Sequence, residues 1–488
     1  MLYEIEISRT LRELLQRRAE CFSDTPVFVY WNPAHTEQIP VTSAEFFGQT
    51  ERLGAWLLAQ GYRGRKLAIL GENSYAWLSA FFAITNSGNV AVLLDKNLSA
   101  KVLKELIEST DCDAVFFSAS YQDTADILKA ETGLPFLCLN DLLQRMEAGQ
   151  DGIEAAIDEF RQKSIQPDDP AVIAFTSGTS GKNKGVILSH ENVASDVTWA
   201  ARYTKSSGKA LHLLPFYHMF GILGMLGPVV WGGTVYINQG LRYIVQDVIQ
   251  VRPVLITAVP AMLPLLYRGI QSIGSGIGMK IISGGAPADM TWMQRFRELG
   301  VRINNGYGMT ECAPCIAMAS ELYDREDGSM KVIDGWKVKI DEPDADGCGE
   351  ILVKGSNVMK GYYRMEDETR EALRDGWMHT GDLGKLDAEG FLSIVGRKKN
   401  LLVLPNGENV SPEELERMVQ PLDGVAECLA SAKGGCLQME VYAPGSDENK
   451  LKEAILNLNH LLPSAKRIKK ILFRQEEFPK NSSMKILR

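Results

Sequence analysis

The sequence has little of several features that mark whole classes of protein. Its eight cysteines among 488 residues are scattered without a disulfide framework. Cys312 and Cys315 form a lone CxxC pair, with no second pair and no histidine cluster to complete a metal site. No stretch approaches the roughly 18 uncharged apolar residues of a membrane helix. We therefore expect reduced cysteines and no integral membrane segment.

An excess of positive charge is also lacking. The formal net charge is −9, from 61 acidic and 52 basic residues, which argues against nucleic acid or an anionic membrane surface as a partner. The first six residues, from Met1 to Glu6, have neither a basic region nor an apolar run. No secretory signal is expected, and the predicted location is the cytoplasm.

Composition and length predict a globular protein of more than one unit. Hydrophobic residues make up 45% and charged residues 23% of the chain, and its length calls for two to four domains or subdomains. Short apolar runs at Lys66–Leu70 and Val90–Leu94 predict buried strands, and Tyr75–Asn86 between them predicts a helix. Such alternation is typical of α/β folds with a largely parallel sheet.

The patterns along the chain predict a division into units. We expect an α/β fold whose large N-terminal domain covers 1–396. Within it we expect two α/β subdomains, over about 1–170 and 171–330, and a small β-barrel-like, β-rich module over 331–395. A charged hinge at 397–399 then leads to a small mobile α+β C-terminal domain over 400–488. In that domain, Ser411 before Pro412 predicts a helix start with Ser at the N-cap.

The most informative segment is FTSGTSGKNKG, from Phe175 to Gly185, between two apolar runs. Its glycines let backbone N–H groups converge, and its hydroxyls and lysines add donors suited to phosphate oxygens. A Walker A loop is excluded, because only two residues separate Gly178 from Gly181-Lys182 and a strand follows. The segment predicts a polyphosphate-binding loop; a Ser/Gly-rich surface turn is the alternative.

Two further motifs fit a nucleotide. The run from Tyr307 to Glu311 offers an aromatic face for a purine, and a carboxylate for the Mg²⁺ that accompanies a triphosphate. The run from Trp377 to Asp382 is expected to place Asp382 after a tight turn, where a carboxylate can accept hydrogen bonds from ribose hydroxyls.

With these motifs in this order, the chain resembles the adenylate-forming (AMP-binding) superfamily, of the acyl-CoA synthetase or fatty acid ligase type. The resemblance runs over nearly the whole chain and also rests on the segments Leu214–Gly221, Ser283–Pro287, Gly396–Lys399, Asn406–Glu416 and Pro479–Lys485. It implies a two-step reaction, in which a carboxylate and MgATP give acyl-AMP and pyrophosphate, and a thiol then displaces AMP.

The resemblance also implies roles for individual residues. Lys485 would bridge the acyl carboxylate and the α-phosphate, Thr310 would contact the α-phosphate, and Glu311 would hold the magnesium. His218, beside Tyr217, would shape or gate the acyl pocket and have no acid–base role. Lys399 would be the pivot of the C-terminal domain, and Gly407 would line the thiol tunnel. ATP and AMP would be bound by Thr176, Ser177, Gly178, Thr179, Lys184, Gly284, Gly285, Ala286, Tyr307, Asp382 and Arg397.

The acid and the acceptor stay open at this level. Members that activate amino acids carry an Asp at the start of the pocket segment, and the run from Phe216 to Phe220 has no carboxylate. We therefore expect a neutral medium- or long-chain fatty acid, with an aryl acid as the alternative. The acceptor is CoA or the phosphopantetheine of an acyl carrier protein. Met484 stands where the family has Gly before the catalytic lysine, so a catalytically impaired nucleotide-binding regulator is a third interpretation, and a luciferase-type oxidase a fourth.

Overall fold

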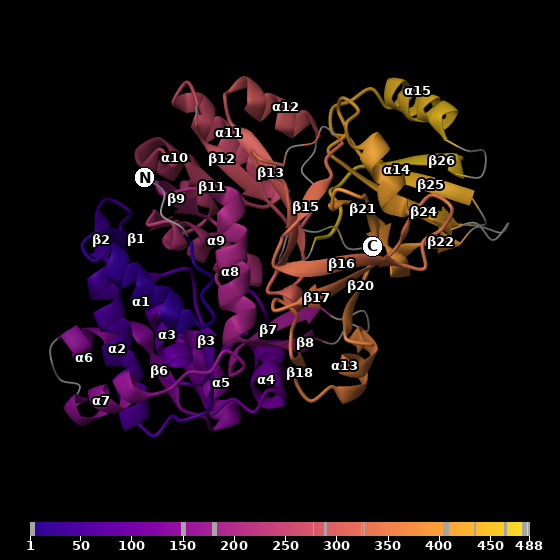
Figure 1. Cartoon of the computed structure of the whole chain (residues 1–488). Helices are drawn as coiled ribbons and strands as arrows, with labels where there is room; N and C mark the ends of the chain where they lie inside the picture. Colours follow the sequence, from indigo (N-terminus) through magenta and orange to yellow (C-terminus); the bar gives the residue numbers. More distant parts are fainter. Residues whose placement is uncertain are drawn as a thin grey trace.

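The computed structural model describes residues 5–147, 153–177, 183–276, 278–286, 290–323, 325, 327–403, 409–433, 436–462, 466–480 and 486. Helices and strands alternate through most of this part of the chain, and the strands gather into two large sheets and two small ones (Figure 1). The predicted α/β fold class is confirmed.

The smaller of the two large sheets has seven strands. Its order is β18-β8-β7-β4-β3-β5-β6. Strands β3 and β4 and helix α3 match the predicted ranges at both ends. The bounds are β3 (Lys66–Leu70), β4 (Val90–Leu94), β5 (Ala114–Phe117), β6 (Phe136–Cys138), β7 (Pro170–Ser177), β8 (Asn183–Ser189) and β18 (Gly361–Tyr362), with helices α3 (Tyr75–Asn86), α4 (Ala100–Ser109), α5 (Gln122–Thr132), α6 (Leu139–Glu147) and α7 (Glu154–Gln162).

The larger sheet has fourteen strands and runs through most of the remaining chain. Its order is β16-β17-β20-β21-β15-β14-β13-β12-β11-β9-β10-β1-β2, with β19 beside β20. Its first strands along the chain are β1 (Pro26–Trp31), β2 (Gln38–Thr42), β9 (Lys209–His212), β10 (Thr234–Ile237), β11 (Leu255–Ala258), β12 (Lys280–Ser283) and β13 (Arg302–Gly308). Helices α1 (Leu11–Cys21), α2 (Ser43–Ala59), α8 (His190–Thr204), α9 (Met219–Val230), α10 (Ile244–Val251), α11 (Leu263–Ser272) and α12 (Met290–Glu298) accompany them.

The two sheets interleave in the sequence. The hairpin of β1 and β2 joins the larger sheet, where Phe28 of β1 pairs with Val235 of β10. Strands β7 and β8 lie in the seven-stranded sheet. Strand β8 also pairs with β18, which follows most strands of the larger sheet in the sequence. One hydrophobic core contains side chains from both sheets and from α8 and α9, so the sheets are packed into one body. The unit boundaries expected near residues 170 and 330 stay predictions.

The predicted β-rich segment forms antiparallel strands. They are β15 (Met330–Val332), β16 (Trp336–Asp341), β17 (Gly349–Gly355), β19 (Leu373–Arg374), β20 (Trp377–Leu386) and β21 (Phe391–Arg397), with α13 (Glu366–Ala372). The antiparallel strand β14 (Cys315–Met318) already precedes the predicted range. Pairing of β13 with β14, and of β15 with β21, joins them to the parallel strands. This continuity places residues near 307, 382 and 397 in one sheet, with 382 and 397 on the neighbouring strands β20 and β21.

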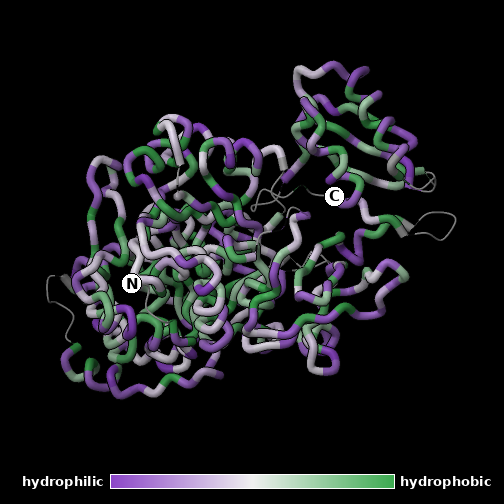
Figure 2. Tube along the Cα trace, turned by 45° about the horizontal axis from the view of Figure 1, so that its top comes forward, coloured by the Kyte–Doolittle hydropathy of each residue, from purple (hydrophilic) through white to green (hydrophobic). Residues whose placement is uncertain are grey.

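The last part of the chain has its own core. Strands β24 (Glu427–Lys433), β25 (Cys436–Tyr442) and β26 (Lys470–Arg474) form one small sheet, β22 (Leu402–Val403) and β23 (Asn409–Val410) pair as another, and helices α14 (Pro412–Val419) and α15 (Glu448–Leu458) complete the unit. Its buried side chains form a separate cluster. In Figure 2, hydrophobic residues lie inside both parts and hydrophilic residues toward the outside.

Helix α14 begins where the sequence predicts, with Ser411 at the N-cap position before Pro412. The Ser411 hydroxyl makes no cap hydrogen bond to the helix. It donates to the carbonyl of Val395 at 3.2 Å and contacts Glu413 Oε2 at 2.9 Å, which ties the helix start to β21. Within the described residues, no helix has both the length and the apolar character that crossing a membrane requires.

Candidate active site

The side chains of three predicted residues, all on strands of the larger sheet, meet one another. Tyr307 on β13 donates its hydroxyl hydrogen to Asp382 Oδ2 at 2.8 Å, and Arg397 Nε on β21 lies 3.0 Å from Asp382 Oδ1. Asp382 and Arg397 are direct partners in the β20–β21 ladder. We call these three residues the Asp382 cluster. Asp382 is 5% exposed, and its carboxylate is bound by Tyr307 on one oxygen and by Arg397 on the other, so it has a fixed orientation.

The surroundings of Asp382 correct one expectation. Asp382 does not follow a tight turn; it lies inside the ten-residue strand β20. Gly381 has φ +70°, a left-handed conformation that favours glycine, and its N–H donates to Glu350 Oε1 at 3.0 Å. The Thr380 hydroxyl donates to the carbonyl of Ile351 and accepts from the N–H of Asp382 at 3.1 Å. A local distortion of the strand, rather than a turn, aims the carboxylate.

A second set of residues joins the two sheets. Glu311 lies in the short 3₁₀ helix η4 (Thr310–Cys312), after β13. Its Oε1 accepts a hydrogen bond of 2.9 Å from the hydroxyl of Tyr362 on β18, and Lys184 Nζ on β8 lies 4.7 Å from the centre of the Tyr362 ring. We call Lys184, Tyr362 and Glu311 the Tyr362 cluster. It brings together a cation and a carboxylate that the sequence places far apart.

Burial gives the Glu311 carboxylate an unusual environment. The residue is 7% exposed, and this burial raises its pKa above the ordinary value. The bond from Tyr362 and the charges of Arg397 and Lys184 act in the opposite direction. Among the described residues, no group of three or more His, Cys, Asp or Glu side chains could hold a metal by itself. A magnesium ion at Glu311 would therefore need oxygens from a ligand, as nucleotide phosphates provide.

The predicted phosphate loop is described only in part. Thr176 on β7 pairs with Lys184 on β8, and Ser177 pairs with Asn183. Gly178 and Thr179 lie outside the described residues, as do Gly407, Met484 and Lys485. The two strands that carry the loop thus bring the predicted Lys184 next to Thr176.

The glycine-rich run Gly284, Gly285 and Ala286, after β12, lies against the predicted acyl-pocket segment from Phe216 to Phe220. A Cβ atom at Gly284 would stand 2.8 Å from the ring of Phe220, and Gly285 has φ +82°. Ala286 follows directly, so the run passes the start of α9. His218 precedes α9, is half-buried and has its ring centre 4.6 Å from that of Tyr217. His218 thus lies two residues before Phe220, whose ring packs close to Gly284, one of the residues predicted to bind ATP.

The predicted pivot lies in the 3₁₀ helix η5 (Lys398–Asn400), directly after β21. Burial, and then the neighbouring charge of Arg397, lower the pKa of Lys399. Its neighbour Lys398 pairs with Glu350 Oε2 at 2.9 Å. Burial alone would raise the pKa of Glu350, but the bonds from Lys398 and the Gly381 N–H bring it below its ordinary value. Glu350 thereby connects the backbone beside Asp382 to the predicted hinge.

Comparison with known proteins decides the family. The model of the AMP-binding enzyme family matches residues 15–363, well over half of the chain. The chain belongs to the AMP-binding enzyme family. The predicted superfamily is confirmed, and with it the class of activity, an AMP-forming acid–CoA ligase.

Curated relatives within this family are CoA ligases. A feruloyl-CoA synthase from Amycolatopsis sp is 31% identical over 408 residues, 80% of this chain and 79% of that protein. A 2-succinylbenzoate–CoA ligase from Bacillus subtilis (strain 168) is 30% identical over 436 residues, 85% of this chain and 83% of its own length. A solved structure of o-succinylbenzoate CoA synthetase from Bacillus subtilis with the acyl-adenylate intermediate OSB-AMP has a TM-score of 0.79 at 26% identity, covering 97% and 96% of the chains.

Sequence reasoning missed three residues that hold the candidate site together. Tyr362 and Glu350 are described above. The third is Asn73, whose side chain donates to the carbonyl of Leu214 at 2.7 Å and accepts from the N–H of Phe216 at 2.9 Å. It thereby fixes the acyl segment to the loop after β3. The partners of each lie far away in sequence, so no local pattern marks these residues.

Proposed function

We propose that this AMP-binding enzyme uses MgATP to activate an aryl acid as acyl-AMP, releasing pyrophosphate, and then transfers the acyl group to the thiol of CoA. The proposed use of MgATP rests on the Asp382 cluster and the Tyr362 cluster. Asp382 is oriented as a ribose acceptor, and Lys184 and Glu311 stand together where phosphates and their magnesium would lie. The acid is proposed from its relatives and from the cavity described below.

The proposed roles follow the charges that must be managed. An anionic carboxylate has to approach an anionic α-phosphate, so cations and N–H donors are needed where charge develops. Lys485 and Thr310 are proposed at the α-phosphate, and Thr176, Ser177, Gly178, Thr179 and Lys184 at the β- and γ-phosphates. Bound magnesium, held through Glu311, would neutralise phosphate charge. Tyr307 and the run Gly284, Gly285 and Ala286 would flank adenine, and Asp382 and Arg397 would hold ribose.

The second step, transfer of the acyl group to CoA, requires a different arrangement of the C-terminal unit. We propose that the unit after residue 400 rotates about Lys399, so that Lys485 leaves and Gly407 lines the thiol tunnel. Lys399 lies at the junction of β21 with this unit, whose hydrophobic core is separate from the rest. A small separate core and a short charged connection are what a moving lid needs.

The acid is proposed to be neutral apart from its carboxylate, and compact. A narrow cavity of about 20 Å³ lies beyond Phe220, between α8, α9, β11, β12 and β14, and none of the residues that line it is charged. That volume holds about one water-sized group. Such a lining would leave an ammonium group unpaired, and such a volume leaves little room for a long alkyl tail.

Aryl acids fit these limits better than the fatty acids that the sequence favoured. The narrow cavity lined by Phe220 can take a small uncharged substituent of such an acid. The relatives support this choice, since feruloyl and 2-succinylbenzoate groups are aryl acids. A medium- or long-chain fatty acid is the second candidate, and an acyl carrier protein in place of CoA is a further outcome of the test.

A substrate panel tests the proposal. Pyrophosphate release is measured with substituted benzoic and cinnamic acids, fatty acids of about eight to sixteen carbons, and amino acids, each with and without CoA or a holo carrier protein. Aryl acids are expected to give the highest release, with CoA as acceptor. Highest release with a fatty acid would replace the acid class, and ATP binding without release for any acid would favour the regulator.

A lysine variant tests the division of the two steps. Lys485→Ala is expected to slow acyl-AMP formation by roughly two orders of magnitude, because one key electrostatic contact is lost. Transfer to CoA from added acyl-AMP is expected to continue at the parent rate. Equal loss in both half-reactions would refute the assigned role.

A further inference from the structure

We propose that Tyr362 is a positioning residue for adenylation, which holds Lys184 and Glu311 apart and in place so that one stays available to phosphate and the other to magnesium. This inference rests on the proposed function, because those roles of Lys184 and Glu311 belong to it. Tyr362 itself need not touch the substrate.

The contacts of Tyr362 reach both partners at once. Its hydroxyl donates to Glu311 Oε1 at 2.9 Å, and the face of its ring receives the ammonium of Lys184, 4.7 Å from the ring centre. Tyr362 is 8% exposed and Glu311 is 7% exposed, so water competes little for these contacts. The buried side chain of Tyr362 thus binds the Glu311 carboxylate through its hydroxyl and the Lys184 ammonium on the face of its ring.

The separation matters because the two charges would otherwise meet. A direct ion pair between Lys184 and Glu311 would occupy the groups that phosphate and magnesium need, and breaking it would cost binding energy. Within the described part of the chain, Lys184 forms no ion pair with a carboxylate. The ring of Tyr362 stabilises the ammonium without neutralising it, and the hydroxyl occupies one oxygen of Glu311 and leaves the other for a metal.

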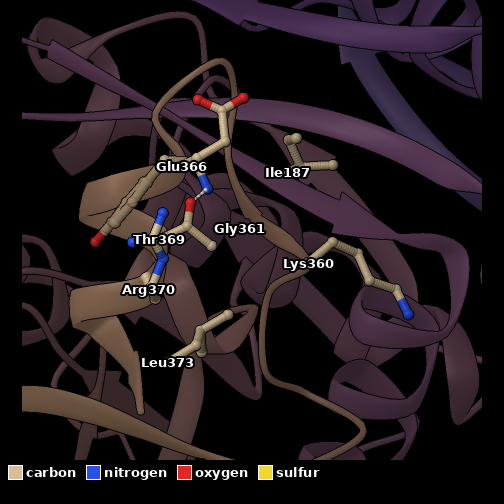
Figure 3. A pocket seen from close by; sticks show the side chains of 8 residues that line it. Ile187, Lys360, Gly361, Glu366, Thr369, Arg370 and Leu373 are labelled. Atoms are coloured by element: carbon tan, nitrogen blue, oxygen red, sulfur yellow. Dashed lines mark hydrogen bonds between the residues drawn. The ribbon is translucent and has the colours of Figure 1, made fainter.

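The backbone around Tyr362 is fixed on the seven-stranded sheet. Tyr362 pairs with Val186 on β8, two residues after Lys184, and its N–H donates to the hydroxyl of Thr369 at 2.8 Å. Thr369 lines a surface hollow of about 370 Å³ beside this segment (Figure 3). The same segment reaches the other sheet, because the N–H of Met359 donates to the carbonyl of Glu311 at 2.8 Å.

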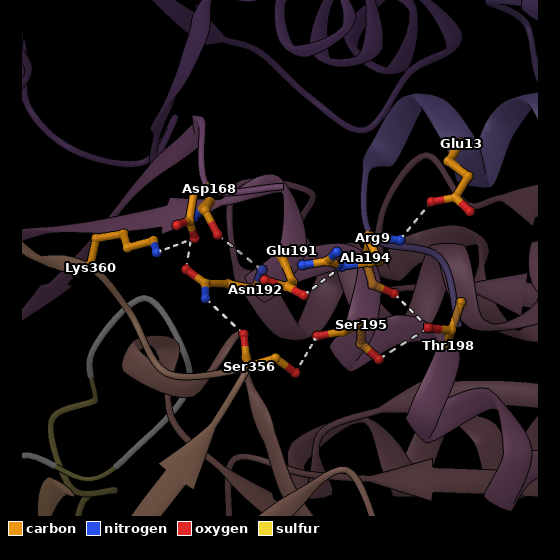
Figure 4. A network of polar contacts seen from close by, with 11 residues as sticks. Arg9, Glu13, Asp168, Glu191, Asn192, Ala194, Ser195, Thr198, Ser356 and Lys360 are labelled. Carbon is orange, nitrogen blue, oxygen red and sulfur yellow. Dashed lines mark hydrogen bonds and ion pairs between the residues drawn. The ribbon is translucent and has the colours of Figure 1, made fainter. Parts of the chain in front are cut away.

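Helix α8 holds the preceding residues. Asn192 donates through Nδ2 to the carbonyls of Ser356 and Val358, at 2.8 and 2.9 Å, and Ser195 and Ser356 share a hydrogen bond of 3.0 Å (Figure 4). Lys360 pairs with Asp168 in the same network. The position of Tyr362 is therefore set from α8, β8 and η4 together, as a positioning residue requires.

The next residue offers a matched control. The hydroxyl of Tyr363 donates to Asp111 Oδ2 at 2.7 Å, and Lys66 Nζ lies 5.6 Å from the centre of its ring. Tyr363 therefore makes the same two kinds of contact, to residues with no proposed role in the reaction. Tyr362→Phe and Tyr363→Phe remove the same atom from adjacent residues, and differ in which carboxylate loses its donor.

The experiment measures metal binding without turnover. Manganese(II) is titrated by electron paramagnetic resonance into the whole protein saturated with α,β-methylene-ATP, in the absence of acid. Tyr362→Phe is expected to weaken manganese binding about tenfold, the size expected of one charge-assisted hydrogen bond. Tyr362→Leu removes the ring as well, and is expected to weaken binding of the analogue itself about threefold further. Tyr363→Phe is expected to match the parent in both.

Steady-state kinetics gives the second readout. Tyr362→Phe is expected to raise the magnesium concentration for half-maximal pyrophosphate release, with the KM for the acid unchanged; general loosening of the site would move both. Manganese affinity within twofold of the parent in Tyr362→Phe, or an equal loss in Tyr363→Phe, would overturn the inference. A parent protein that binds neither the analogue nor manganese would instead overturn the proposed function.

Discussion

The Asp382 cluster is built within one sheet, whereas the Tyr362 cluster joins two. Tyr307, Asp382 and Arg397 come from β13, β20 and β21 of the fourteen-stranded sheet, and two of them are direct partners in one ladder. Lys184 and Tyr362 come from the seven-stranded sheet, and Glu311 follows β13 of the other. Strand register thus sets the Asp382–Arg397 pair, to which Tyr307 adds a side-chain hydrogen bond, whereas the geometry of the second cluster is set by how the two sheets pack.

This difference has a consequence for how each cluster should respond to change. Strand register is discrete, because a shift by one residue would turn every side chain to the other face. Packing between sheets can adjust by small amounts, and small displacements of reacting groups are costly in rate. We therefore expect the Asp382 cluster mainly to govern nucleotide affinity, and the Tyr362 cluster to govern binding of the metal and, through it, the rate of adenylation.

The largest expected effect tests the cluster between the sheets. Glu311→Gln keeps the shape of the side chain and the bond from Tyr362, but removes the charge proposed to hold magnesium. Acyl-AMP formation, measured as pyrophosphate release at saturating ATP, is expected to fall about a hundredfold. CoA transfer from added acyl-AMP serves as the control and should persist. A fall in ATP affinity with an unchanged maximal rate would reverse the assignment of the two clusters.

A smaller effect is expected in the cluster within one sheet. Asp382→Asn keeps one acceptor oxygen but loses the charge that receives ribose hydroxyls. The KM for ATP is expected to rise about tenfold, and the preference for ATP over 2′-deoxy-ATP to shrink, with kcat largely kept. Asp387→Asn, in the turn of the same β20–β21 hairpin, is the matched control. The preference between the two nucleotides should stay at the parent value in that control.

The smallest effect concerns the junction that carries Lys184. His190 begins α8 directly after β8, is buried, and accepts a hydrogen bond from the N–H of Leu11 at 3.3 Å. Burial, and then the charge of Arg12, lower the pKa of His190 to about 4, although Asp169 acts the other way. In the unfolded chain His190 has its ordinary pKa of 6.5, so it binds a proton at a pH at which it stays neutral in the folded chain. The free energy of unfolding therefore falls as the pH falls from 6.5 to about 4.

Thermal unfolding between pH 7 and pH 4 measures this loss. The parent midpoint is expected to fall over that range, and the midpoint of His190→Asn to fall less, because the amide oxygen still accepts from Leu11 and does not titrate. Identical slopes for the two proteins would show that His190 does not contribute. Pyrophosphate release after return to pH 7 checks that the junction refolds with Lys184 in place.

The sequence predicted the buried parallel strands best. Lys66–Leu70 and Val90–Leu94 are continuous apolar runs with clear ends, so local pattern alone places them. It did not predict that the hairpin of β1 and β2 would join β10, because strand pairing over such a distance depends on the packing of the whole chain. The tight turn expected before Asp382 was wrong, because pairing with β17 at Met378 and His379, and with β21 from Asp382 onward, keeps the strand continuous on both sides of Gly381.

Site residues divide in the same way. Tyr307, Glu311 and Asp382 were identified from short motifs, because each motif combines residue types suited to a nucleotide. Tyr362 and Asn73 were not, since a tyrosine after a glycine and an asparagine in a loop are common, and only their partners reveal their roles. Motifs thus indicate candidate ligand-binding groups, whereas the residues that contact and orient these groups emerge only from the fold.

The pairing of β1 with β10 also bears on how the chain is made. Thr234 donates to the carbonyl of Pro26 across 208 residues of sequence. At ribosomal speeds of about 5–20 residues per second, the β1–β2 hairpin waits roughly 10–40 s for the strand it must join. Until then β1 has an unpaired edge, the kind of surface that recruits foreign strands. Among the strand pairs of the described residues, β1 and β10 are the farthest apart in sequence, so β1 waits longest for its partner and is a segment that a chaperone could protect during synthesis.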